Sequence, residues 1–165
     1  APDWRKEDGR WSLVLNGRDR YFWLPKEALP TGAFTLTMEV KPTGRGRRVL
    51  MQSGNTHPGF LVVAIDDGRL TGAYQAFDDE KHGGRTFVLD PKLDLPIGKW
   101  STLEIRYDLE RMTFRVNGRQ GEPIEIGLPA TIFSDLIVGG HIGLKNTGFF
   151  KGAVRALRIR HNNRQ

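Results

Sequence analysis

Acidic side chains in this sequence could serve a glycosidase only if two of them projected to the same side of one strand. A general acid and a nucleophile must lie about 5 Å apart to cleave a glycosidic bond with retention. The acidic groups Asp66-Asp67, Asp78-Asp79-Glu80 and Asp108 with Glu110 all fall at expected turns. Because consecutive residues of an extended chain point to opposite faces, none of these groups forms such a pair. The sequence therefore predicts no catalysis by paired carboxylates.

Metal binding has weak support from the residue types. The histidines show no short spacing such as His-x-x-x-His, which a transition-metal site would use, and there is no cysteine for a thiolate site or a disulfide. Ca²⁺ suits the sequence better because it takes hard oxygen ligands from loops. We expect no cofactor unless it is Ca²⁺, for which the candidate ligands are Asp66, Asp67, Asp78, Asp79 and Asp135.

A sugar-binding patch is the chemistry that the sequence favours most. An exposed aromatic ring stacks on the apolar face of a pyranose, while amides and charged groups bond its hydroxyls. Tyr74 meets this need because it lies close to the polar segment 78–84. The expected carbohydrate-binding patch comprises His57, Tyr74, Gln75 and, for an anionic sugar, Arg85 and Lys145. The alternative is that Tyr74 lies in the core and the other residues in solvated loops.

Tryptophans could also provide stacking platforms. Trp4, Trp11 and Trp23 are all candidates. Trp23 ends the run Tyr21-Phe22-Trp23, in which consecutive side chains of a strand must face both sides. At least one of these three aromatic residues is therefore expected at the surface.

Short strands separated by turns account for most of the chain, because glycines and prolines fall between short apolar runs. Residues 34–40 alternate apolar and polar side chains, which indicates a half-buried strand. Residues 49–52 and 60–65 are apolar at both alternating positions and are expected in the interior of a sheet. Further strands are expected at 70–77, 86–89, 103–107, 112–116, 135–144 and 152–160.

Turn signals connect these strands into hairpins. Asn16-Gly17 is a strong two-residue hairpin signal, so the chain is expected to open with a hairpin over 11–23. Segments 60–77 and 103–116 each predict another. No stretch of ten or more residues has a capped helical period, although 129–135 could hold one short turn. About eleven to thirteen strands predict an all-β fold of two packed antiparallel sheets.

Length and charge limit the class of protein further. The 165 residues fit a single domain over 1–165, and no apolar stretch approaches the ~20 residues that cross a bilayer. The formal net charge of +6 could suit a polyanion. However, the basic residues are scattered and lack the aromatic interleaving of an RNA-binding sheet. We therefore expect no membrane partner and no nucleic acid partner.

The order of these motifs resembles that of the laminin-G-like domains of the concanavalin A-like lectin and glucanase group. Residues 12–21 resemble the opening block of apolar strand, Gly, Asp and aromatic residue, and 34–42 resemble the second block. Residues 98–108 resemble a segment of Gly-Lys-Trp followed by alternating apolar residues and Tyr-Asp, and Val116-Asn117-Gly118 and 149–159 complete the series. The resemblance implies a two-sheet antiparallel jelly-roll β-sandwich with Trp100 packed inward.

The resemblance also implies a function, although the fold alone does not define one. We expect a noncatalytic carbohydrate-binding or accessory domain of an exported bacterial protein, extracellular or periplasmic. Its expected partners are a polysaccharide or glycoconjugate and an adjoining catalytic domain. One alternative is a small jelly-roll glycoside hydrolase, because His141-Ile142-Gly143-Leu144 resembles, more loosely, the closing motif of 3-keto-glycoside hydrolases. The other alternative is a protein-interaction or spacer module.

Overall fold

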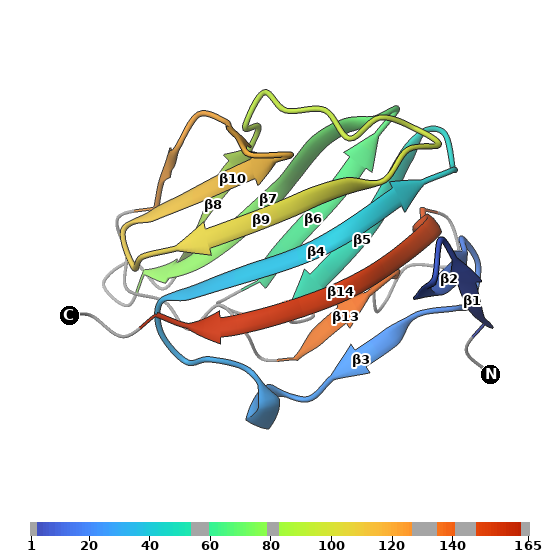
Figure 1. Cartoon of the computed structure of the whole chain (residues 1–165). Helices are drawn as coiled ribbons and strands as arrows, with labels where there is room; N and C mark the ends of the chain where they lie inside the picture. The colour runs from blue at the N-terminus through green and yellow to red at the C-terminus, as the bar shows by residue number, and fades with distance from the viewer. Residues whose placement is uncertain (1–2, 54–59, 79–82, 127–134, 141–147, 163–165) are drawn as a thin grey trace.

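Two antiparallel sheets pack face to face in the computed structural model, which describes residues 3–53, 60–78, 83–126, 135–140 and 148–162 (Figure 1). The larger sheet has eight strands in the order β1-β2-β14-β4-β9-β10-β11, with β12 beside β10. Its strands are β1 (Asp3–Glu7), β2 (Arg10–Asn16), β14 (Lys151–His161), β4 (Phe34–Pro42), β9 (Ser101–Tyr107), β10 (Arg111–Val116), β11 (Arg119–Gln120) and β12 (Ile124–Glu125).

The smaller sheet has six strands in the order β3-β13-β5-β6-β7-β8. They are β3 (Phe22–Leu24), β13 (Leu136–Val138), β5 (Arg47–Ser53), β6 (Phe60–Asp66), β7 (Arg69–Asp78) and β8 (Gly83–Leu89), and one 3₁₀ turn follows β3 at Lys26–Ala28. The predicted β-sandwich is confirmed, and β5 and β6 are interior strands as expected. The fourteen strands in the described residues exceed the predicted eleven to thirteen, and β1, β11 and β12 are strands that the sequence did not predict.

The core lies between the sheets, and β4 shows how the sequence builds it. Phe34, Leu36, Met38 and Val40 are buried, while the alternating residues from Thr35 to Lys41 face the outside of the larger sheet. Each buried side chain of this size contributes roughly 1.5–3 kcal/mol relative to an exposed one. No helix in the described part of the chain is long and apolar enough to span a membrane.

Two-residue turns join several antiparallel neighbours. Asp8-Gly9 joins β1 to β2 and Asn117-Gly118 joins β10 to β11, and all four residues have positive φ between 49° and 82°. This is the type I′ geometry that matches the twist of paired strands. The predicted hairpins β6–β7 and β9–β10 are confirmed.

The predicted opening hairpin over 11–23 is wrong. β2 belongs to the larger sheet and β3 to the smaller one, so the segment that contains Asn16-Gly17 carries the chain from one sheet to the other. The Asn16 Oδ1 atom accepts hydrogen bonds from the backbone N–H groups of Arg18, Asp19 and Arg20 at 3.0–3.2 Å. This side chain holds a wider turn, and the true opening hairpin is β1–β2.

The last strand, β14, lies between β2 and β4, so the C-terminal strand of the chain is interior in the larger sheet (Figure 1). A register shift interrupts its pairing with β4 between Arg155 and Arg158, and Ala156 there has φ 53°. Such a β-bulge bends a strand and increases its twist. Most of the segment 129–135, for which a short turn was predicted, lies outside the described residues.

Candidate functional site

The sequence-predicted sugar patch is only partly within the described structure. His57 and Lys145 lie outside the described residues, and Gln75 and Arg85 lie on the paired strands β7 and β8, with side chains that are not described. Tyr74 is fully buried, and its ring stacks on Phe87 with 6.3 Å between centroids. Burial raises the pKa of the Tyr74 hydroxyl.

Tyr74 therefore cannot act as the exposed stacking platform that the sequence suggested. Its position on β7 directs the side chain into the sandwich, where it packs with the other core residues. This corrects the expectation for Tyr74 in favour of the alternative stated above. Sugar binding by the remaining patch residues stays a prediction.

The calcium candidates are dispersed where they can be placed. The Asp67 Oδ1 atom accepts a hydrogen bond from the Gly46 N–H at 2.7 Å, and Asp135 Oδ1 accepts one from the Lys26 N–H at 2.9 Å. Both carboxylates thus stabilise turns. The described residues contain no group of three or more acidic or histidine side chains arranged to hold an ion. Asp79 and the Asp78 side chain are not described, so Ca²⁺ binding stays a prediction.

A cleft lies beneath the β1–β2 hairpin, which forms its roof. Trp4 pairs with Leu13 and Lys6 pairs with Trp11 across the hairpin, so the two tryptophans are diagonal neighbours on one face. The same face continues inward to the buried Leu13 and Leu15. The indole groups are 57% and 61% exposed, which is uncommon for large aromatic side chains.

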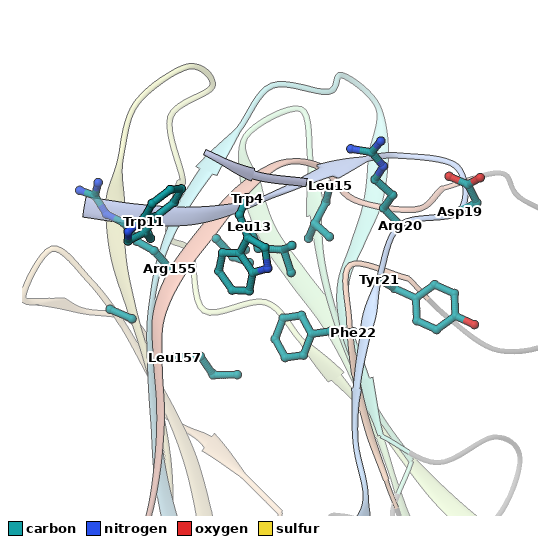
Figure 2. A pocket seen from close by; sticks show the side chains of 12 residues that line it. Trp4, Trp11, Leu13, Leu15, Asp19, Arg20, Tyr21, Phe22, Arg155 and Leu157 are labelled. Atoms are coloured by element: carbon teal, nitrogen blue, oxygen red, sulfur yellow. The ribbon is translucent and has the colours of Figure 1, made fainter. Parts of the chain in front are cut away.

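The walls of this aromatic cleft come from one strand of each sheet, and its volume is about 630 Å³. Figure 2 shows Trp4 and Phe22 pointing toward each other across the cleft, with Leu157 of β14 below Trp4 and opposite Phe22. Tyr21 lies at the rim, 53% exposed, and points away from Trp4 (Figure 2). A concave, mainly apolar surface of this size with several aromatic side chains is typical of small-ligand sites.

The cleft exists because the two sheets separate at this edge. β2 pairs with β14 only from Lys151 to Val154, and the bulge follows at once. On the opposite side β3 is a three-residue edge strand of the smaller sheet. Phe22 and Leu157, which would otherwise be covered by a continuing sheet, are left only half-buried.

Ion pairs hold the tip of the hairpin roof against the larger sheet. Glu7 and Arg10 flank the Asp8-Gly9 turn and reach over to β4, where Glu7 Oε1 lies 2.7 Å from Lys41 Nζ. Arg10 Nη1 donates to Glu39 Oε1 at 2.9 Å, and Arg155 Nη2 donates to the same oxygen at 3.3 Å. We call Glu7, Arg10, Glu39, Lys41 and Arg155 the hairpin latch.

Trp100 packs against the hairpin latch on the outer face of the larger sheet. The Arg155 guanidinium lies 4.0 Å from the centre of the Trp100 ring, a cation–π contact. Trp100 is only half-buried, so its expected place in the core is wrong. It covers an arginine on the outer face because β14 and β4 direct Arg155 and Lys41 outward there.

Acid should loosen the hairpin latch. Burial raises the pKa of Glu39, but hydrogen bonds from Arg10 and Arg155 outweigh it, so this pKa lies below its ordinary value of 4.5. The hydrogen bond from Lys41 likewise lowers the pKa of Glu7. A lowered folded-state pKa adds stability above the unfolded value, ~4.3, that is lost as pH falls through the folded value.

The Tm of the chain is therefore expected to fall as the pH drops below about 5. The Glu7→Gln variant lacks one of the titrating latch groups and should lose less over the same interval in thermal melts followed by circular dichroism. An identical pH dependence in both chains would contradict a contribution from Glu7.

Sequence reasoning named Trp4 and Trp11 as possible platforms but did not place them together. The missed signal is Asp8-Gly9, which is itself a hairpin dipeptide. Taken as the turn, it pairs Glu7 with Arg10 and puts both tryptophans on one face. The expectation for Tyr21-Phe22-Trp23 is confirmed, since Tyr21 and Trp23 are both more than half exposed.

Solved structures similar to this chain share its fold at low sequence identity. Domains LG4-5 of the mouse laminin alpha1 chain are 22% identical with a TM-score of 0.64, and the match covers 90% of this chain but only 40% of that one. Domain 4 of an extracellular arabinanase from Geobacillus stearothermophilus, solved with arabinotriose, is 16% identical with a TM-score of 0.72 and coverage of 96% and 74%.

The CBM40 domain of a Ruminococcus gnavus sialidase, solved with α2,3-sialyllactose, is 12% identical, with a TM-score of 0.58 and coverage of 78% and 75%. No curated protein matches the sequence significantly. The family model of the concanavalin A-like lectin/glucanases superfamily matches residues 16–164, which confirms the resemblance seen in the sequence. The chain belongs to this superfamily.

Proposed function

We propose that this chain is a noncatalytic carbohydrate-binding domain and that the aromatic cleft is its glycan site. The observation that carries the proposal is the pair of exposed indoles, Trp4 and Trp11, side by side on the cleft roof with Phe22 opposite. Flat aromatic rings stack well on the apolar face of a pyranose. Because these rings are exposed to water, a sugar that covers them removes apolar surface from water, which favours binding.

Polar groups at the rim can bond sugar hydroxyls. Asp19 and Arg20 line the cleft, and Lys6 is exposed on the same hairpin face as Trp11. Arg20 is already paired with Asp3 at 2.7 Å, which leaves Lys6 as the cation best placed for an acidic sugar. These positions support an anionic polysaccharide as the preferred ligand.

The similar structures support the same proposal. The arabinanase domain and the sialidase domain were each solved with an oligosaccharide, and the laminin and arabinanase structures come from larger proteins. By analogy we propose an exported bacterial protein in which this chain serves an adjoining catalytic domain.

The described part of the cleft has too few carboxylates for hydrolysis by an acid and a nucleophile, which favours binding over catalysis. Among the residues that line it in the described structure, Asp19 is the single acidic side chain, and it accepts a hydrogen bond from Asn16 Nδ2 at 2.6 Å. Acid-and-nucleophile hydrolysis needs a second carboxyl group nearby. A small jelly-roll hydrolase is therefore the second candidate, supported by the fold alone.

Indole NMR signals provide the test. A panel of neutral, uronic-acid and sulfated oligosaccharides is titrated into ¹⁵N-labelled chain, in which each tryptophan gives one side-chain N–H signal. We expect a binding glycan to shift the signals of Trp4 and Trp11 and to leave that of Trp23, on the smaller sheet, in place. If no glycan binds, or if a glycan binds without moving these two signals, the proposed site is wrong.

A further inference from the structure

The last strand of the chain has a free edge next to the aromatic cleft. β2 pairs with β14 only as far as Val154, whereas β4 pairs with β14 as far as His161. Over residues 155–160, no described strand pairs with β14 on the side that faces away from β4. Backbone N–H and C=O groups on this edge have no strand partner among the described residues, and such groups can pair with another strand.

Along this edge, one face of β14 is apolar and the other is basic. Leu157 and Ile159 are half-buried and pack against the core on the cleft side. Arg158 and Arg160 are exposed and lie beside Thr37 and Thr35, on the outer face of the larger sheet. An added strand would therefore place alternate side chains over apolar residues and the others beside arginines.

Charge argues against a second copy of this chain as the partner. In an antiparallel β14–β14 pair, the arginines of both strands would share one face, where like charges on neighbouring strands are destabilising. Charges on an edge are also a common protection against self-association. Carboxylates at those positions of a partner strand would instead be attracted to Arg158 and Arg160.

We infer that residues 155–160 of β14 bind an extended segment of a different protein by antiparallel strand addition, and that this segment alternates apolar with acidic residues. Its apolar side chains extend the core at Leu157 and Ile159. Its main-chain hydrogen bonds supply affinity, and the alternating side chains supply specificity. The inference rests on β14 and not on the tryptophans of the proposed glycan site, which lie on the β1–β2 hairpin, although residues 155–157 also line the cleft.

A tail fused to the full chain tests this surface. A flexible Gly/Ser linker after Gln165 is followed by a segment in which valine and glutamate alternate. The segment has the length of the free edge of β14, and the linker lets it fold back on that strand at high effective concentration. We expect the edge-facing amides of residues 155–160 to exchange about tenfold more slowly with solvent deuterium. A control tail with the same residues in separate valine and glutamate blocks should give no protection.

The Arg158→Glu variant tests the charge rule. It should weaken docking of the valine–glutamate tail about fivefold, because the new carboxylate repels the glutamates of the tail. A valine–lysine tail should restore docking, because its lysines are attracted to that carboxylate. Arg119→Glu changes the net charge equally at an exposed position on β11 and should have no effect.

Equal protection by alternating and block tails, or none by either, overturns the inference. So does an unchanged preference for glutamate in Arg158→Glu. Concentration-dependent protection of residues 155–160 in the chain without a tail would identify a second copy as the occupant and would also overturn it.

Discussion

Replacing Trp4 and Trp11 together by alanine is expected to weaken glycan binding about a hundredfold. Truncation of a tryptophan at the centre of an interface often costs about 2 kcal/mol or more, and a factor of a hundred corresponds to about 2.7 kcal/mol. The two losses are not additive because both rings cover the same ligand. Isothermal titration calorimetry with the glycan that shifts the indole signals measures the change.

Trp23→Ala provides the matched control for this double variant. Trp23 is 57% exposed, as Trp4 is, but it lies on β3 and does not line the cleft. Its removal should leave affinity unchanged. A comparable loss of affinity in Trp23→Ala, or normal binding by a folded Trp4→Ala/Trp11→Ala chain, would move the site away from the cleft.

Glu39→Ala is expected to lower the free energy of unfolding by about 3 kcal/mol, at the low end for breaking a buried ion pair. The Arg155 side chain is only 9% exposed, and Glu39 is its acidic partner in the latch. Removal of Glu39 takes away the carboxylate that is hydrogen-bonded to this buried cation in the described structure, and leaves it the ring of Trp100 and the more distant charge of Glu7. For a chain of this size the Tm should fall by roughly 6–12 °C.

A compensating substitution distinguishes two causes of the lost stability, an unpaired buried charge and the loss of side-chain packing. The double variant Glu39→Gln/Arg155→Met removes the cation and leaves an apolar side chain against Trp100, so it should recover most of the lost stability. Urea unfolding of both variants gives the comparison. If Glu39→Ala is as stable as the parent chain, the hairpin latch contributes little to stability.

Regular alternation made the strands predictable. In β4 and β9 every second residue is apolar, and only one arrangement of such a strand buries those side chains. The Asn16-Gly17 error has a local cause, because a dipeptide common in hairpins is used here with an Asn16 side chain that closes a wider turn.

The site was harder to predict because it depends on which strands are neighbours. The polar segment beside Tyr74 suggests an exposed ring, yet the alternation of β7 buries it. The cleft needs β14 to lie next to β2, a pairing between residues more than a hundred positions apart in the sequence. Turn signals and strand periodicity describe neighbours along the chain and do not specify such pairs.

The place of β14 between β2 and β4 also has a consequence for biosynthesis. The N-terminal hairpin contacts the rest of its sheet through β14, which is made after every other strand of the sandwich. β4 keeps an open edge until β14 arrives, so the larger sheet is completed only after the other strands of the sandwich have been made. Such distant pairings make folding slow, and the exposed edge of β4 during that delay is the surface most in need of a chaperone.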